Sequence, residues 1–315
     1  MRAAIASAVV LWASVARADS NDLVMSRLGV PITDSSGNPT SFVGDSLAFR
    51  ALSSQLGTVL APHLLTPADS LGFSGFQMTV DYSSTTIDRG ATYWRALAGT
   101  APSSLQTIGF FARKGLWFPI PSFEFGAGAV HLIDSHMWTG QLYAKASLHE
   151  GYHDLPLPSL AVRGAVSRLM TQRELDLTSA SLDITVSKHF GVGGTWRFDP
   201  FVGWDLLMII PRSEVIDGTP NIDPLQPGNE SDSMNDFVFH DQDTIYRNRF
   251  FVGTKLQYYV FQITLEAQFA LAGTSLDDQL GTNTACAPMS TTTACDSKDT
   301  AKAQTTLSLA AGFDF

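Results

Sequence analysis

The chain has 315 residues, with 20 Lys and Arg against 30 Asp and Glu, and its formal net charge is −10. This charge argues against nucleic acid as a partner, because phosphate binding needs a basic surface. No Gly-rich phosphate loop and no metal-ligand spacing occurs, so we predict neither a cofactor nor a metal site. We also find no nucleophile motif of the Gly-x-Ser-x-Gly type, and an enzyme is therefore not the first expectation.

Residues 1–18 have the pattern of a secretory signal peptide. Arg2 precedes an apolar run that is too short to span a bilayer, and small residues occupy positions 16 and 18. We interpret this segment as cleaved after Ala18. An N-terminal core helix is the alternative. After residue 18, no run approaches the ~20 consecutive apolar residues that a membrane helix needs. Two classes of exported protein then remain, a secreted all-β domain and a transmembrane barrel.

Residues 19–69 are predicted to form an N-terminal extension. Asp45 can cap a helix whose apolar positions recur at helical spacing, and Pro62 would end it. The apolar positions are Ala48, Leu52, Leu56, Val59 and Leu60. The helix is either a plug in or under a barrel mouth, or it rests against the wall or in the periplasm.

Residues 70–315 alternate with period two, as strands with one apolar face do. Ten such segments occur, at 76–82, 108–113, 123–129, 142–148, 160–167, 180–187, 202–210, 250–260, 262–271 and 304–315. Most can run to ~10 residues, which exceeds the ~5–6 typical of soluble sheets. We therefore predict an all-β fold, a transmembrane antiparallel up-and-down β-barrel of about ten strands.

Charges of both signs fall near the middle of the polar face. In a narrow barrel they would point inward and need one another, because a buried unpaired charge is costly. The predicted lumen-lining residues are Asp81, Arg113, Glu124, Lys145, Arg163, Asp183, Asp205, Lys255 and Glu266.

The connections between the predicted strands are unequal in length. The three longest, 83–104, 212–244 and 273–303, fall on the same side of the barrel as 133–137 and 170–174. Short periplasmic turns and long outer loops are typical of such barrels, so we expect this side to face outward. The acidic 212–244 loop could hold divalent cations or simply be solvated. We expect Cys286 and Cys295 to form a disulfide that closes a loop.

Two groups of histidines are candidates for catalysis. His131, Asp134, Ser135 and His136 cluster at one predicted outer turn, where a Ser–His pair or a His beside a carboxylate could act on a substrate. The group faintly resembles the rim sites of outer-membrane proteases. His149, His153 and Asp154 lie near a periplasmic turn. Solvated turns are the preferred interpretation of both.

The terminal strand ends on an aromatic residue, with Phe313 and Phe315 on its apolar face. This ending resembles the closing strand of Gram-negative outer-membrane β-barrels, although this chain has Ala310 where that family often has Gly. The resemblance implies that Phe313 and Phe315 form the signal read by the barrel-assembly machinery. It also implies an outer-membrane location with lipid and lipopolysaccharide as partners.

Two functions are compatible with a barrel of this width, because about eight strands fill the interior and 16–18 leave a wide channel. The first is a narrow channel or passive transporter of a small solute, gated by the lumen charges. The second is a closed-lumen structural or surface-binding barrel of the cell envelope. An outer-membrane hydrolase is the third.

Overall fold

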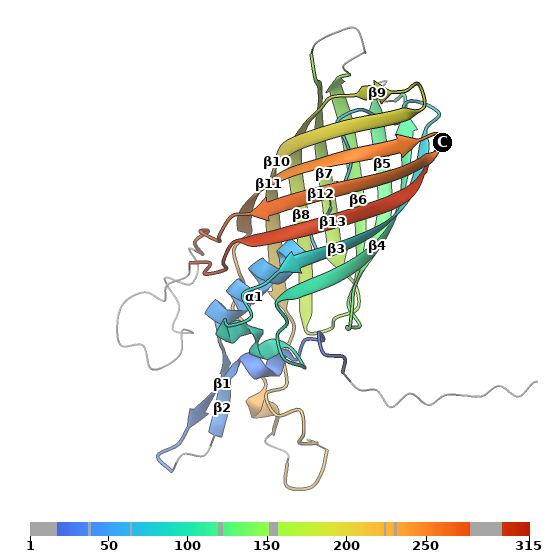
Figure 1. The fold of residues 1–315 in the computed structure, drawn as a ribbon. Coiled ribbons are helices and arrows are strands. Elements are labelled where there is room, and N and C mark those ends of the chain that lie inside the picture. Colours follow the sequence, from blue (N-terminus) through green and yellow to red (C-terminus); the bar gives the residue numbers. More distant parts are fainter. Residues whose placement is uncertain are drawn as a thin grey trace, which may run out of the picture.

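The structure is a computed structural model. It describes residues 18–36, 39–63, 65–118, 122–150, 157–223, 225–229, 232–277 and 298–315. Within these ranges the chain forms one closed antiparallel barrel with an N-terminal segment at one end and inside it (Figure 1).

Ten strands form the barrel wall, so the predicted fold class is confirmed. They are β3 (Phe76–Thr86), β4 (Ser104–Leu116), β5 (Phe123–Leu132), β6 (Trp138–His149), β7 (Ser159–Leu169), β8 (Leu175–Ser187), β10 (Trp196–Ser213), β11 (Ile245–Tyr258), β12 (Phe261–Ala270) and β13 (Gln304–Asp314). Each pairs with its neighbour in order around the wall. β13 pairs with β3, and β10 pairs with both β8 and β11, so the sheet closes without a free edge.

The remaining helices and strands are not among the ten wall strands. They are η1 (Met25–Leu28), β1 (Gly29–Thr33), β2 (Pro39–Gly44), α1 (Ser46–Val59), η2 (Thr92–Ala96), β9 (Phe190–Val192) and η3 (Asp232–Asn235). β1 and β2 form a separate hairpin, and β9 pairs with the start of β10. No helix in the described ranges is long and apolar enough to cross a membrane.

Side chains alternate across the wall as the sequence predicts. On β3, Gln77, Thr79 and Asp81 are buried inside, whereas Val80 is 50% exposed on the outside. Large apolar side chains are exposed on the outer face of all ten wall strands, for example Phe110 on β4 and Leu265 on β12. The barrel is therefore apolar outside and polar inside, which is the reverse of a soluble domain.

The two ends of the barrel differ. At the tight-turn end, β11 and β12 are joined by Tyr259 and Val260 alone, and the backbone of Phe315 pairs with that of Phe76 at 2.8 and 2.9 Å. At the loop end, strands β3, β10 and β12 lead into the long connections 87–103, 214–244 and 271–303, of which 224, 230–231 and 278–297 lie outside the described residues. The predicted partition of the connections between two sides of the barrel therefore holds in the structure.

Inside the wall, aromatic rings occupy space that facing glycines leave free. A Cβ added to Gly126 would collide with the Tyr143 ring, and one added to Gly128 would collide with Phe111. In the same way, a Cβ added to Gly203 would collide with Phe251, and one added to Gly253 would collide with Phe201. These buried rings therefore come from β4 and β6 on one part of the wall and from β10 and β11 on another.

Candidate functional site

The lumen is the candidate site, because all nine predicted lumen charges lie in it. The nine predicted lumen residues come one each from nine neighbouring strands, and each is at most 5% exposed. Buried charge at this density is sustainable only when the groups bond to one another or to other polar groups. The structure supplies both kinds of partner.

Several of these charges form ion pairs across adjacent strands. Arg163 Nε lies 2.7 Å from Asp183 Oδ2, and Lys145 Nζ lies 3.2 Å from Glu124 Oε2. Lys255 Nζ lies 2.6 Å from Asp314 Oδ2 on the closing strand.

Two predicted residues are placed differently. Arg113 donates to Gln77 Oε1 at 2.5 Å and forms no ion pair among the described residues. Asp81 is buried, and neither of its carboxylate oxygens has a hydrogen-bond partner among the described protein groups. The lumen charges are therefore brought together as several pairs rather than as one continuous chain.

Two buried arginines of β11 were missed by the sequence interpretation. Arg249 pairs with Asp205 and also donates to Gln268 Oε1 at 3.1 Å. Arg247 donates to Ser54 Oγ of α1 at 2.8 Å. Both lie at alternate positions upstream of Lys255, so extending the period-two pattern backward past Phe250 would have found them.

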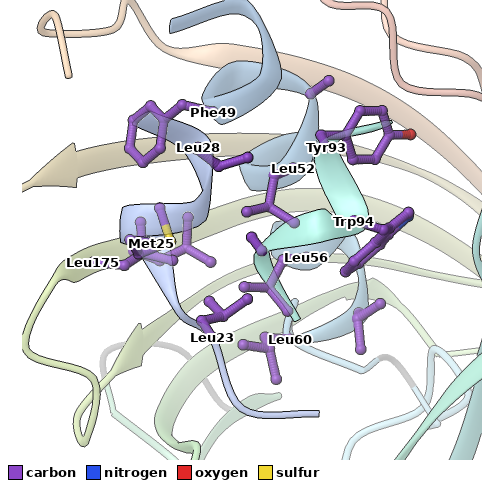
Figure 2. Packing of buried hydrophobic residues seen from close by; sticks show 14 of the residues in the cluster. Leu23, Met25, Leu28, Phe49, Leu52, Leu56, Leu60, Tyr93, Trp94 and Leu175 are labelled. Atoms are coloured by element: carbon purple, nitrogen blue, oxygen red, sulfur yellow. The ribbon is translucent and has the colours of Figure 1, made fainter. Parts of the chain in front are cut away.

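Helix α1 fills the barrel at its loop end. Asp45 Oδ1 accepts a hydrogen bond from the amide of Ala48 at 3.0 Å, which caps the helix where the sequence predicts a cap. Leu52, Leu56 and Leu60 pack into the main apolar cluster, together with Trp94 of η2 and Leu28 of η1 (Figure 2). Gly57 faces Ile209 of the wall so closely that a Cβ would collide with it.

The polar side of α1 is buried as well. Arg50 is fully buried, and its guanidinium donates to the Asp243 carbonyl at 3.0 Å and lies 3.7 Å from Asp277. Ser54 Oγ donates to Asp299 Oδ2 at 2.6 Å. From Ala48 to Val59 the helix is therefore buried, with polar side chains bonded to the wall and loops. The structure thus places it in the barrel mouth at the loop end, and not in a position beyond the tight turns.

Residues 61–63 and 65–75, together here called the lumen segment, continue from α1 without helix or strand. Wall side chains donate to its carbonyls: Arg249 to Pro62 at 3.3 Å, Arg163 to His63 at 3.4 Å and Lys145 to Asp69 at 2.9 Å. Wall carboxylates accept from its amides: Glu266 from Leu65 at 2.9 Å and Glu124 from Leu71 at 3.3 Å. Four of the nine predicted lumen charges, those of Glu124, Lys145, Arg163 and Glu266, therefore bind the protein's own backbone.

Little space remains beside the lumen segment. A polar cavity of about 110 Å³ lies at the tight-turn end, lined among others by Asp69, Lys145, Arg197, Lys255 and Asp314. A cavity of this size holds a few water molecules. It does not form a continuous path along the barrel, because the mouth beyond it is filled by α1.

The rim residues considered as catalytic do not form a nucleophile–base pair. Ser135 Oγ is buried and donates to the Leu132 carbonyl at 2.8 Å, while His131 stacks on Trp138. His136 Nδ1 lies 2.7 Å from Asp22 Oδ2, and Asp134 has a left-handed backbone at the turn. These four residues build the turn and anchor the N-terminal segment to it.

The His136–Asp22 contact shifts both groups. The hydrogen bond to Asp22 and its charge raise the pKa of His136 above its ordinary 6.5. Partial burial acts to raise the pKa of Asp22, but hydrogen bonds from the backbone and ring of His136 outweigh this and lower it below 3.8. Asp19 lies near, and these three side chains are the group of potential metal ligands found in the described ranges.

The remaining predicted sites are only partly visible. Cys286, Cys295, His153 and Asp154 lie outside the described residues. In the acidic 212–244 loop, Asp217 accepts from the amide of Thr219 and Asp232 accepts from Asn235, so these carboxylates bond within their own loop. At the other end, the ring of Phe313 lies 5.0 Å from Phe261 and 6.2 Å from Phe315 on the outer face.

No family model and no curated protein matches this sequence. Among solved structures, Ail, the attachment invasion locus protein of Yersinia pestis, is 9% identical with a TM-score of 0.27, over 77% of this chain and 99% of that one. The outer membrane protease OmpT from Escherichia coli is 9% identical with a TM-score of 0.33, over 76% and 95%. Similarities this low carry no argument about function, and the barrel is defined by its own strand pairing.

Proposed function

We propose that the chain is an integral outer-membrane β-barrel whose lumen is closed by its own N-terminal segment, and that it acts through its loop end as a structural or surface-binding protein of the cell envelope. The observation that carries this proposal is the contact between the wall charges and the lumen segment. Arg163, Lys145 and Glu124 bind backbone groups of that segment and are not free to contact a passing solute.

The membrane location is supported by the two faces of the wall. Leu182, Val202 and Leu309 are among the large apolar side chains exposed on the outer face. Exposed apolar surface on every strand of a closed barrel is stable in lipid and unfavourable in water. The aromatic ending at Phe313 and Phe315 is consistent with insertion by the barrel-assembly machinery, as the family resemblance implies.

The channel hypothesis requires an open path, and the filled lumen does not favour it. Planar-bilayer conductance tests the difference. We expect the full-length protein to be silent. A variant lacking residues 19–69, in which α1 and most of the lumen segment are removed, should show discrete conductance steps. Slower migration of the heated protein on gels, compared with the unheated one, checks that both barrels are folded.

Conductance steps in the full-length protein that change with Lys255→Ala would overturn the closed-lumen proposal and favour a narrow channel. Lys255 is the informative position, because it lines the small cavity and bonds to Asp314 rather than to the lumen segment. Its replacement therefore leaves the plug contacts in place.

A further inference from the structure

The N-terminal residues and the start of the barrel lie at opposite ends of the molecule. Residues 18–36 and 39–45, here called the cap, contact the connections at the loop end. The amide of Asn21 donates to the Asp134 carbonyl at 2.8 Å, and that of Met25 donates to Glu174 Oε2 at 3.1 Å. Strand β3 begins at Phe76, beside the C-terminal Phe315, at the tight-turn end. In Figure 1 the cap hairpin and the C-terminus accordingly lie at the two extremes of the barrel.

The connection between these two ends runs inside the barrel. Strand β7 shows this most directly, because three of its inward residues contact successive parts of the segment. Ser167, near the loop end, donates to the Leu60 carbonyl at 2.8 Å, and Arg163 donates to the His63 carbonyl. Ser159, at the tight-turn end, donates to the Asp69 side chain. The segment therefore passes through the full depth of the wall.

The path cannot lie on the outer face of the wall. Every one of these donors is on the inward face of β7 and is at most 3% exposed. The segment reaches the tight-turn end at Ser74, whose carbonyl accepts from Lys114 Nζ at 2.8 Å. From there the chain enters β3 without crossing the wall.

We propose that the cap is displayed on the outer face of the membrane and reaches it through the barrel, so that the protein translocates its own N-terminal segment. This inference rests on the proposed membrane location, in which the tight-turn end faces the periplasm. Because the chain that follows the cap lies inside the wall, the lumen is the direct route by which a chain delivered from the periplasm places the cap at the loop end. The β1–β2 hairpin and α1 must then fold after passage, because the finished lumen has no room for them beside the lumen segment.

Several contacts hold the cap at the loop end of the barrel. Arg95 of the β3–β4 connection bonds to Asp45 at 2.8 Å, and Leu23 pairs with Leu97 by backbone bonding. Gly29 and Gly44 of the hairpin lie against the rings of Phe237 and Phe239. These contacts come from two different outer connections, so the cap also ties those connections together above the mouth.

Labelling of single cysteines with a membrane-impermeant maleimide tests the proposal. In a background with Cys286→Ser and Cys295→Ser, three exposed positions are compared: Ser36→Cys in the cap, Asp223→Cys in an outer connection and Thr195→Cys at the tight-turn end. In intact cells we expect Ser36→Cys to be labelled to the same extent as Asp223→Cys. Thr195→Cys should react only after the outer membrane is opened.

The remaining outcomes separate this inference from the membrane location. Labelling of Asp223→Cys without Ser36→Cys would overturn surface display of the cap and leave the barrel's orientation intact. Labelling of Thr195→Cys alone would overturn the orientation itself, and so would labelling of none of the three. The heat-dependent gel shift shows for each variant that the barrel has folded, so a misassembled variant is replaced by a neighbouring exposed position, for example Ser35→Cys.

Discussion

The lumen is closed by two different kinds of interaction along its length. Near the loop end, α1 packs leucines against Trp94 and the apolar ends of the strands, and this burial needs no particular bond geometry. Deeper in the barrel, the lumen segment has no helix and few apolar contacts, and charged wall side chains bond to its backbone. One plug thus combines hydrophobic packing with polar contacts in its helical half, and relies mainly on directional polar contacts in its non-helical half.

This difference follows from the wall. Inward positions near the loop end include a group of apolar side chains, such as Leu177, Leu207 and Ile209, beside the buried Arg247, whereas many deeper ones carry charge. The backbone of the lumen segment has amides and carbonyls that no helix or strand satisfies, and charged wall side chains can bond to them. In a helix the backbone amides and carbonyls are already bonded to one another. The comparison teaches that the plug is helical where the wall provides a group of apolar side chains and non-helical where the wall side chains are charged.

The largest effect is expected from breaking the polar half. Lys145→Met removes the partner of Glu124 and the donor to the Pro67 and Asp69 carbonyls. Loss of one member of a buried pair costs about 3–5 kcal/mol. We expect a loss of this size in the free energy of unfolding in micelles, and faster hydrogen exchange in residues 65–72 than in α1.

The matched control is Lys302→Met. Lys302 pairs with Asp88 at 2.8 Å, but its side chain is 72% exposed, and exposed pairs contribute about 0–1 kcal/mol. Adding Glu124→Gln to Lys145→Met should restore part of the loss, because the uncompensated charge is removed. Equal effects of Lys145→Met and Lys302→Met would show that the polar half does not hold the segment.

A somewhat smaller effect is expected from the apolar half. Leu56→Ala creates a cavity in the cluster around α1 and should cost about 2–5 kcal/mol, with faster exchange in α1 and unchanged protection in residues 65–72. Leu47→Ala is the control on the same helix, because Leu47 is 39% exposed. If Leu56→Ala loosened both halves equally, the two would be one cooperative unit and the comparison would fail.

The smallest effect concerns the anchor of the cap. The raised pKa of His136 means that its charged contact with Asp22 is fully present below the ordinary 6.5 and is lost as pH rises through the raised value. The lowered pKa of Asp22 keeps that carboxylate charged until pH falls below its ordinary 3.8. Amides of residues 19–24 should therefore exchange faster relative to free peptide at about pH 9 than at about pH 5.5. His136→Gln should abolish this difference, and its persistence would exclude the contact as the cause.

The wall could be predicted from the sequence because its signal is local. Alternation at Gln77, Thr79 and Asp81 against Met78 and Val80 reports directly which face meets the apolar phase. The same rule placed Asp183 and Glu266 on the polar face, where the structure has them. The capping signal at Asp45 is equally local, and the helix begins one residue later.

The plug could not be placed in the same way. Periodicity gives α1 one apolar face, yet Ser54 and Gln55 on its other face are also buried, because Asp299 and Trp94 offer them hydrogen bonds. Whether a polar helix face meets water or a polar wall depends on contacts distant in sequence, such as Ser54 with Asp299. The same distance explains why charges predicted to face a solute instead bind residues 61–75.

The wall side chains bind the lumen segment mainly through the main chain of that segment. This has a consequence for how the sequences of the wall and of the segment can vary. Carbonyls at Pro62, His63 and Pro67 are present whatever side chain those positions carry. Exchanges there should be tolerated wherever volume permits, whereas the guanidinium and ammonium groups opposite them have no substitute. Substitutions should thus be tolerated more readily in the lumen segment than at the charged wall positions that bind it.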